Sequence, residues 1–364
     1  MPDIMTSKER WLAALQGQPV DRVPFWPKVG GAYSSYQQEP FHSMGDAELH
    51  RWIGSDRHVG GPSCVRPIRS KTSIERATEN DVQTTVYRTP AGTLTSVDGF
   101  EPVSRTWHPR EFPVKTPDDI ETMTQFYADE TCEFDPDQLE RAETLIRDLD
   151  GDAIATTGIG ISPLMDWLQH LAGIENGHLF LADHRGAVEA LFEQMHRVLC
   201  RRAEIAAAHS PCPVIYSVEN TSTTLISPEM FREYCLEHLM DYGRIIRGAG
   251  KFHVLHMCGH LKKLLPDIAT LPATGIEAFT SPPVGNTLLV DGRTALPEKC
   301  LIGGTSAVQW LEPAETIIAT IERDLAALPH ARGIVLTSAG VMPPACQPET
   351  IRKVAEWLRG YPAS

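Results

Sequence analysis

Residues 252–259 read Phe252-His253-Val254-Leu255-His256-Met257-Cys258-Gly259. This apolar run is typical of a buried strand, and it ends in a His-x-Cys pair. Because side chains alternate across a strand, His256 and Cys258 project to the same face. Imidazole and thiolate are ligands that Zn²⁺ prefers. A helical segment begins near Leu261, so the two metal-type ligands stand at the exit of a strand, where an α/β barrel carries its chemistry. The alternative is a chance pair whose cysteine is only a small buried apolar residue.

A strand–helix pattern surrounds this stretch from about residue 137 onward. Alternating strands and helices of this length predict a parallel sheet, and strands that are apolar on both faces are typical of one. The predicted fold class is therefore α/β, a closed (β/α)8 TIM barrel, with a doubly wound open sheet as the alternative. The absence of a GxGxxG or Walker sequence weakens a nucleotide-binding interpretation. The predicted strands are 153–157, 214–218, 252–258, 276–279, 301–304 and 334–337, and the main helices are 139–149, 188–208, 227–247, 314–328 and 349–359.

The N-terminal part of the chain is less regular. We predict a short amphipathic helix over 7–16, entry into a first strand over 20–26, and a β-hairpin over 82–100 with its turn at 90–92. Four prolines between Pro102 and Pro117 predict an irregular connection. Residues 1–364 are expected to form a single barrel domain. Residues 1–135 would supply an N-terminal extension with the first strand and the hairpin excursion, and residues 136–364 the regular βα units.

Composition limits the function classes. The formal net charge of −14 argues against nonspecific nucleic-acid binding and against adsorption to anionic membranes. No apolar run reaches the roughly 20 residues of a membrane span, and the first ten residues lack the apolar core of a secretion signal. The eight cysteines are scattered without CxxC pairs, which indicates reduced thiols and a cytoplasmic protein.

The chain resembles the uroporphyrinogen decarboxylase superfamily over nearly its whole length. The segments that carry the resemblance are 9–15, Val20-Asp21-Arg22-Val23-Pro24, Ser227-Pro228-Glu229-Met230-Phe231, His256-Met257-Cys258-Gly259 and Gln347-Pro348-Glu349-Thr350-Ile351. The family fold is a (β/α)8 barrel, as the strand–helix pattern predicts. The true decarboxylases carry arginines after the first strand to hold the carboxylates of a tetrapyrrole. The corresponding stretch here, Phe25 to Tyr33, has one lysine and no arginine.

The chain is more similar to the second branch of that superfamily, the cobalamin-dependent methyltransferases. That branch carries a zinc bound by His-x-Cys and a later cysteine, and the subset that demethylates methoxylated aromatics is the most similar to residues 218–221 and 256–260. The resemblance implies Zn²⁺ on His256 and Cys258. The position expected for the later cysteine holds Gly340, and Cys346 lies six residues further on. Cys346 and Glu219 are the competing candidates for the third ligand.

Other polar residues at predicted strand ends have less specific interpretations. Glu219 and Glu277 are candidate catalytic carboxylates, whereas Asn220, Ser338 and His260 are expected to be structural or solvent-facing. His253, one residue out of phase with His256, is expected to pack against a helix. The candidates for an aromatic pocket are Trp26, Tyr33, Tyr36, Trp167 and Trp310, whereas Trp11, Trp52 and Trp357 are expected to pack on helices.

The resemblance implies a zinc-dependent methyltransferase. Zinc would act as a Lewis acid on the oxygen of a small methylated substrate, most simply a methoxylated aromatic, while a corrinoid cobalt accepts the methyl group. The chain has no Asp-x-His-x-x-Gly cobalamin sequence, so we expect the cobalamin on a partner corrinoid protein that docks over the barrel mouth. Three alternatives stay open: transfer from methylcobalamin to a thiol of the coenzyme M type, decarboxylation, and a non-catalytic ligand-binding barrel. The direction of transfer is also open, as is a homodimer.

Overall fold

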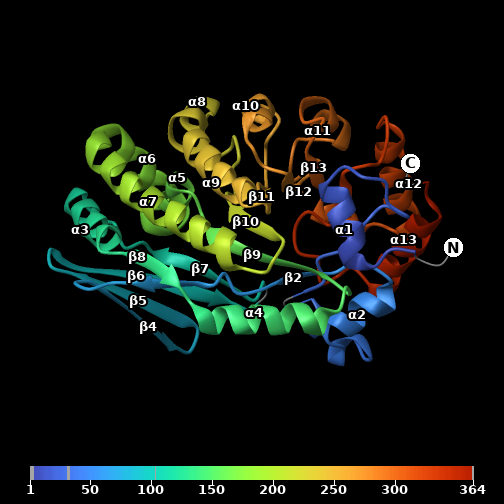
Figure 1. Cartoon of the computed structure of the whole chain (residues 1–364), viewed down its shortest axis with the longest axis horizontal. Coiled ribbons are helices and arrows are strands. Elements are labelled where there is room, and N and C mark those ends of the chain that lie inside the picture. Colours follow the sequence, from blue (N-terminus) through green and yellow to red (C-terminus); the bar gives the residue numbers. More distant parts are fainter. Residues whose placement is uncertain (1–3, 31–32, 103, 363–364) are drawn as a thin grey trace.

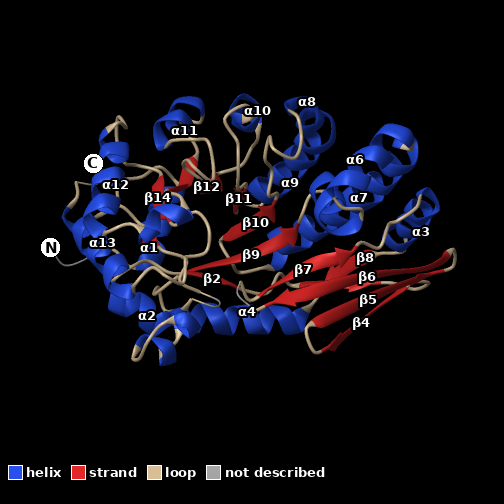
Figure 2. Cartoon of the chain, turned by 180° about the vertical axis from the view of Figure 1, so that it is seen from behind, coloured by secondary structure: helices blue, strands red, loops and turns tan. Residues whose placement is uncertain are grey.

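The computed structural model describes residues 4–30, 33–102 and 104–362. Its centre is an eight-stranded sheet in which neighbouring strands pair in parallel (Figure 1 and Figure 2). The strand order is β1-β14-β13-β12-β11-β10-β9-β2. This order confirms the (β/α)8 barrel. The strands are β1 (Phe25–Trp26), β2 (His58–Gly60), β9 (Ile154–Gly160), β10 (Val214–Val218), β11 (Phe252–His256), β12 (Gly275–Phe279), β13 (Cys300–Gly304) and β14 (Ile334–Thr337).

Helices surround the barrel and cover the outer face of its strands (Figure 2). Between the β strands from β9 onward they alternate as the sequence pattern predicts. The helices are α1 (Ser7–Leu15), α2 (Asp46–Ile53), α3 (Pro117–Ala128), α4 (Pro136–Leu149), α5 (Pro163–Asp166), α6 (Ile174–Asp183), α7 (Arg185–His209), α8 (Pro228–Phe231), α9 (Glu237–Gly248), α10 (Leu265–Thr270), α11 (Leu289–Ala295), α12 (Ala314–Ala326) and α13 (Pro348–Gly360). Short 3₁₀ helices span 34–36, 41–43 and 307–311, and π-helical turns span 167–171 and 232–236.

The predicted hairpin is confirmed, but it belongs to a larger excursion. The strands β5 (Val82–Thr89) and β6 (Gly92–Glu101) form the centre of a four-stranded antiparallel sheet with β4 (Ser73–Glu79) and β7 (Thr106–Glu111). The prediction of an irregular connection over 102–117 is therefore wrong for β7. Pro109 is tolerated there because β7 is an edge strand. Residue 103 lies outside the described residues. A further antiparallel pair joins β3 (Val65–Ile68) to β8 (Thr131–Phe134).

The floor of the barrel is closed by α1. A capping box starts this helix, because the Thr6 side chain accepts from the backbone of Glu9 and the Glu9 carboxylate accepts from the backbone of Thr6. Trp11 then packs among inward side chains such as Val214 and Val254, and its ring lies edge-on to Trp26 at 5.7 Å. Trp11 was expected to pack on helices, and that expectation is wrong. The reason is that α1 lies across the open end of the barrel.

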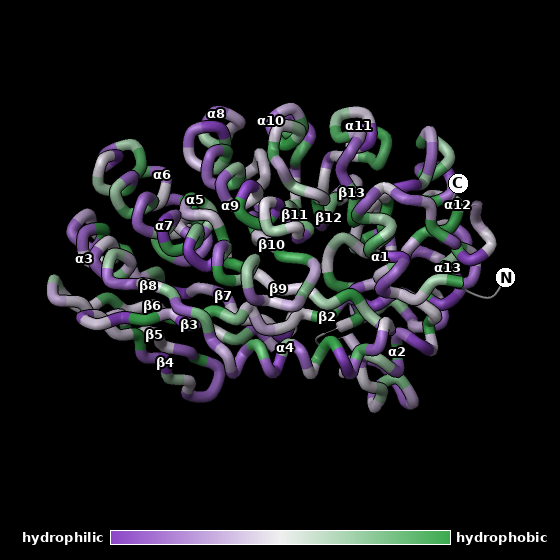
Figure 3. The backbone as a smooth tube through the Cα atoms, in the orientation of Figure 1, coloured by the Kyte–Doolittle hydropathy of each residue, from purple (hydrophilic) through white to green (hydrophobic). Residues whose placement is uncertain are grey.

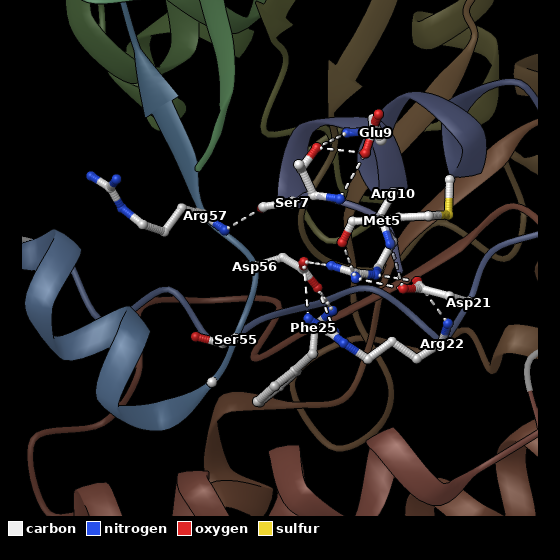
Figure 4. A network of polar contacts seen from close by, with 12 residues as sticks. Met5, Ser7, Glu9, Arg10, Asp21, Arg22, Phe25, Ser55, Asp56 and Arg57 are labelled. Carbon is white, nitrogen blue, oxygen red and sulfur yellow. Dashed lines mark hydrogen bonds and ion pairs between the residues drawn. The ribbon is translucent and has the colours of Figure 1, made fainter. Parts of the chain in front are cut away.

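The strands β1 and β2 stand at the two ends of the strand order, and no ladder joins them in the described part of the chain. Asp56 bridges this seam. Its backbone N–H donates to the Phe25 carbonyl at 2.7 Å, and its Oδ2 accepts from the Phe25 N–H at 2.9 Å. Two guanidinium groups hold the same carboxylate, Arg10 at 2.5 Å and Arg22 at 2.7 Å, as Figure 4 shows. Asp56 is fully buried. We call this group of Arg10, Arg22, Phe25 and Asp56 the seam clamp.

Hydropathy follows this architecture. In Figure 3 the barrel strand β10 is coloured as hydrophobic and the outer strand β4 as hydrophilic, in keeping with the exposure of every residue of β4. Among the helices that the structure describes, none combines the length and apolar content that a membrane crossing requires.

Candidate functional site

The side chains of β11 alternate between the barrel interior and the outside, as expected for a strand. Phe252 and Val254 pack with the side chains inside the barrel, and His256 follows on the same side. His253 points outward: its Nε2 lies 2.9 Å from the Ser217 Oγ, and it packs against Gly243 of α9. Burial lowers the pKa of His253 to about 3. The prediction that His253 packs against a helix is confirmed.

His256 is fixed by a chain of charged groups from two other strands. Its Nδ1 is hydrogen-bonded to the Glu277 Oε2 on the neighbouring strand β12, and the Glu277 Oε1 pairs with the Lys28 ammonium just after β1. Lys28 also donates to the Ala339 carbonyl at 3.3 Å and lies 5.0 Å from the centre of the Trp26 ring. Glu277 therefore holds the Nδ1 of His256, and the Nε2 is the ring nitrogen that does not contact this carboxylate.

Their mutual contacts favour the ionised forms of Glu277 and His256. Burial alone would raise the pKa of Glu277, but Lys28 and His256 outweigh it and bring that pKa to about 2. Burial would likewise lower the pKa of His256, but hydrogen bonds to Cys258 and Glu277 raise it to about 9. An imidazole must be neutral to bind a metal, so metal binding at His256 would release a proton.

Cys258 is linked through Asn220 to Gln169, which lies after β9. Its thiol donates to the Asn220 Oδ1 at 3.3 Å, and the Asn220 side-chain amide donates to the Gln169 Oε1 at 2.7 Å. The loop after β10 is tied to β11, because the N–H groups of Glu219 and Asn220 both donate to the His256 carbonyl. Gln169 lines a cavity of about 640 Å³ that also touches Phe112. The His-x-Cys pair is therefore connected by two hydrogen bonds to the wall of a cavity.

Glu219 is the most unusual carboxyl group in this region. It is 0% exposed, its Oε1 accepts from the Ser162 N–H at 3.2 Å, and its Oε2 has no hydrogen-bond partner among the residues described. Burial raises its pKa to about 8. The side chains of Ser162, Gln169 and Thr221 also contain buried polar atoms without a partner in the described chain. Buried polar groups are normally paired, so this concentration indicates a place that receives a ligand or water.

The raised pKa of Glu219 predicts a pH-dependent stability that Glu219→Gln should flatten. Between the ordinary pKa of 4.5 and the folded value of about 8, the folded protein holds this proton and the unfolded chain does not. The stability contribution is full below pH 4.5 and is lost as pH rises through 8, with a slope of about 1.4 kcal/mol per pH unit. Denaturant unfolding of chelator-treated protein at several pH values measures it. Glu315→Gln, at an exposed position, is the control, and equal slopes for both variants would refute the prediction.

Cys346 lies apart from this group. Its side chain belongs to the core outside the barrel, its sulfur contacts the Gln347 carbonyl at 3.8 Å, and its own carbonyl accepts from the Tyr33 hydroxyl at 2.5 Å. Burial raises the pKa of its thiol to about 12. The structure thus brings Glu219 to the loop beside His256 and does not bring Cys346 there.

The donor chemistry of His256, Cys258 and Glu219 fits a zinc ion. Nitrogen, sulfur and carboxylate oxygen are its common ligands, and a ligating histidine usually donates its second nitrogen to a carboxylate, as His256 does to Glu277. The three ligand atoms do not all lie within 4.8 Å of one another in the described structure. The orphaned Oε2 of Glu219 supplies the observation on which this fit depends.

Backbone strain marks the same rim. Lys28, Asn220, Ala278 and Ala339 have positive φ angles between 48° and 61°, and each lies at or just beyond the carboxyl end of a barrel strand. Such conformations cost about 1–3 kcal/mol each for residues other than glycine and cluster at functional sites. The strained residues therefore lie at the same end of the barrel as His256.

Sequence reasoning missed two residues of this site. The sequence identified Lys28 only as too little positive charge for a polycarboxylate substrate, and not as the ion-pair partner of Glu277. His58, on β2, stacks on Trp26 at 4.2 Å inside the barrel, and its Nε2 has no partner in the described chain. No sequence signal identified His58, because β2 has only three residues.

The predicted aromatic pocket is wrong in composition. Trp26 faces the interior, but Tyr33 and Trp310 are buried outside the barrel, where Trp310 stacks on Phe25. Trp167 packs against Phe180 and Phe192, and the Tyr36 hydroxyl donates to the Pro102 carbonyl. The aromatic rings that do share the interior come from Trp11, Trp26, His58 and Tyr216.

Comparison with known families shows which family the chain belongs to. The family model described as uroporphyrinogen decarboxylase (URO-D) matches residues 110–361. The chain belongs to the uroporphyrinogen decarboxylase family. Membership supports an enzymatic barrel.

One solved structure shares this fold, and a second shows a weaker likeness. A methyltransferase from Methanosarcina mazei is similar at 17% identity and a TM-score of 0.58, over 98% of each chain. A B12-independent methionine synthase from Shewanella sp. W3-18-1 is similar at 14% identity and a TM-score of 0.46, over 93% of this chain and 97% of that one. A comparison with curated proteins gives no match.

Proposed function

We propose that this family member is a zinc-dependent methyltransferase that moves a methyl group from a small methylated substrate to the cobalt of a corrinoid. The observation that carries the proposal is the Lys28–Glu277–His256 chain of contacts beside Cys258, at the carboxyl ends of the barrel strands. The orphaned Glu219 oxygen belongs to the loop whose backbone is hydrogen-bonded to the His256 carbonyl. A methoxylated aromatic is the substrate class we favour, and a partner protein would carry the cobalamin. The shared fold of the Methanosarcina methyltransferase is consistent with this assignment.

The residues divide into ligands and supports. His256 Nε2, Cys258 Sγ and Glu219 Oε2 would hold the zinc, so we favour Glu219 over Cys346 as the third ligand. When bound, zinc supplies a Lewis acid that stabilises negative charge on the oxygen that loses its methyl group. Glu277 fixes the ring and tautomer of His256, and Lys28 fixes Glu277. We therefore assign Glu277 as a positioning residue and not as a group that touches substrate.

Charge at the mouth argues against a polycarboxylate substrate. Lys28 is the one cation in the described residues 25–30 and 33, and its ammonium is already paired with Glu277. Arg10 and Arg22 belong to the seam clamp at the opposite, amino end of the strands. A substrate with many carboxylates would need several unengaged guanidinium groups. Decarboxylation of a tetrapyrrole is accordingly the weaker candidate within this family.

The rim offers a surface for a partner. Apolar side chains are exposed in loops and helices that follow several barrel strands, and Val341 reaches 65% exposure. They lie on segments that follow β9, β12, β13 and β14, and exposed apolar surface can mark an interaction site. We propose that the corrinoid protein docks here, over the zinc ligands. These exposed residues are Ile174, Leu179, Val284, Leu288, Val308, Leu311 and Val341.

Methyl transfer to free cob(I)alamin tests the proposed function. Purified protein is mixed with cob(I)alamin and a panel of methoxylated aromatics, and formation of methylcobalamin is followed by its visible absorption. We expect activity that a chelator abolishes and added zinc restores. The control reaction omits the methoxylated compound.

Three other results would each replace the proposal. Methylation of a thiol by methylcobalamin would keep the zinc and reverse the direction. Activity that is indifferent to chelation would exclude the Lewis-acid mechanism. Loss of carbon dioxide from uroporphyrinogen, again without a metal requirement, would assign the chain to the decarboxylases.

A further inference from the structure

A second group of metal-type ligands lies outside the barrel. His196 and Cys200 are one turn apart on α7, and Asp241 is on the adjacent helix α9 (Figure 1). Their ligand atoms all lie within 4.8 Å of one another, and no other trio of His, Cys, Asp or Glu side chains in the described chain reaches that criterion. The i, i+4 spacing puts two ligands on one helix face, as in helical zinc sites.

The distances suit a common metal centre. The Cys200 Sγ lies 3.5 Å from the His196 Nε2, and the Asp241 Oδ2 lies 3.2 Å from the same nitrogen. Zinc bonds of about 2.0 Å to nitrogen or oxygen and about 2.3 Å to sulfur, in tetrahedral geometry, separate the ligand atoms by about 3.3–3.6 Å. The two separations from the His196 Nε2 therefore already match a tetrahedral ion, and the Cys200 Sγ and Asp241 Oδ2 lie within 4.8 Å of each other.

Contacts from Tyr242 and Arg244 hold the side chains of His196 and Asp241 in this orientation. The His196 Nδ1 lies 2.9 Å from the hydroxyl of Tyr242, which is buried, so Nε2 is left to face Cys200 and Asp241. Arg244 donates to the Asp241 Oδ1 at 2.9 Å and leaves Oδ2 toward His196. Such support of the second imidazole nitrogen is a regular property of metal sites.

A nearby histidine offers a second indication. His238 stacks on His196 with ring centres 4.1 Å apart, and its buried Nδ1 has no partner among the described residues. The side chains of His196 and Asp241 are 20% and 41% exposed, so an ion can reach the group from solvent. A simple ion pair would explain Asp241 and His196 but not the thiol beside them.

We propose that His196 Nε2, Cys200 Sγ and Asp241 Oδ2 bind a divalent zinc-class metal ion that clamps α7 to α9. The ligand set of imidazole, thiolate and carboxylate selects such an ion over calcium or magnesium. The ion joins two helices that cover the barrel, and α9 leads directly into β11, which carries His256. This site is structural, and it does not depend on the proposed methyl transfer.

Cobalt(II) is the probe, because a thiolate ligand gives it an intense near-ultraviolet charge-transfer absorption. The experiment uses the full-length Cys258→Ser protein, so that the thiol beside His256 cannot contribute. We expect one cobalt per chain with this absorption. The further change Cys200→Ser should abolish it, and Asp241→Asn should weaken cobalt binding at least about 10-fold, the scale of losses at metal sites. Glu204→Gln, on an exposed part of α7, is the matched control and should change nothing.

Stability supplies a second measurement. Zinc should raise the melting temperature of Cys258→Ser protein, and Asp241→Asn, which alters a half-exposed side chain, should remove that increase without unfolding the chain. The proposal is overturned if Cys258→Ser protein shows no thiolate–cobalt absorption, or if the absorption survives Cys200→Ser. Neither outcome bears on the methyltransferase assay, which is read separately.

Discussion

His256→Ala protein is expected to lose zinc affinity at the barrel mouth by more than about 100-fold and to show no methyl transfer above background. Removal of a supporting residue alone typically costs 10–100-fold in metal affinity, and His256 is a proposed direct ligand. The fold should persist, because His256 lies at the rim and its side chain is partly exposed. Competition with a chelator, followed by elemental analysis, measures the affinity. The Cys200→Ser background removes the contribution of the site between α7 and α9.

Two companion variants make this result specific. His260→Asn changes a histidine four residues away that is not a proposed ligand, and it should bind zinc as the parent does. The zinc affinity of Glu277→Gln should lie between those of His256→Ala and His260→Asn, about 10–100-fold below that of the parent protein. The reason is that the His256 ring loses its anionic partner but keeps Nε2 as a ligand atom. Full zinc retention by His256→Ala would show that the metal, if present, is held elsewhere.

Asp56→Ala is expected to destabilise the protein by about 3–5 kcal/mol, the largest effect on stability that we predict. The change removes the buried carboxylate that lies between two guanidinium groups, although Arg10 keeps its ion pair with Asp21. The seam also loses the hydrogen bond from the Phe25 N–H. Urea unfolding monitored by tryptophan fluorescence and by circular dichroism gives the change in free energy.

An exposed ion pair provides the comparison. Arg352 and Glu356 pair at 2.9 Å on the surface of α13, with side chains about half exposed. Glu356→Ala should cost only about 0.3–0.5 kcal/mol, because solvent screens such pairs. If Asp56→Ala cost no more free energy of unfolding than Glu356→Ala, the seam clamp would stabilise the protein no more than an exposed ion pair does.

The regular half of the barrel could be predicted because its signals are local. The predicted limits of β10 and β14 coincide with the observed ones, since each is a short apolar run between polar turns. The strands β1 and β2 have two and three residues, too few for periodicity to identify them. The strand β7 was hidden by Pro109, which signals a break unless the strand is known to lie at an edge.

The candidate site could likewise be predicted only where its contacts are local in the sequence. The shared face of His256 and Cys258, and the opposite face of His253, follow from the alternation of a single strand. The pairing of Glu277 with Lys28 joins β12 to the segment after β1, and only the closed barrel brings those segments together. The candidate ligands could therefore be predicted from the sequence. The residues that hold them, Glu277 and Lys28, are brought together only by tertiary contacts.

The pairing of β1 with β14 has a consequence for how the chain is made. Phe25 pairs with Leu336, so the first barrel strand to leave the ribosome finds its neighbour only when synthesis is nearly complete. Contacts of such long sequence separation form slowly, and an open sheet exposes unpaired edges in the meantime. Nascent chains should thus depend on chaperones until β14 emerges, and a stop codon shortly before residue 334 should yield an aggregating product and not a smaller barrel.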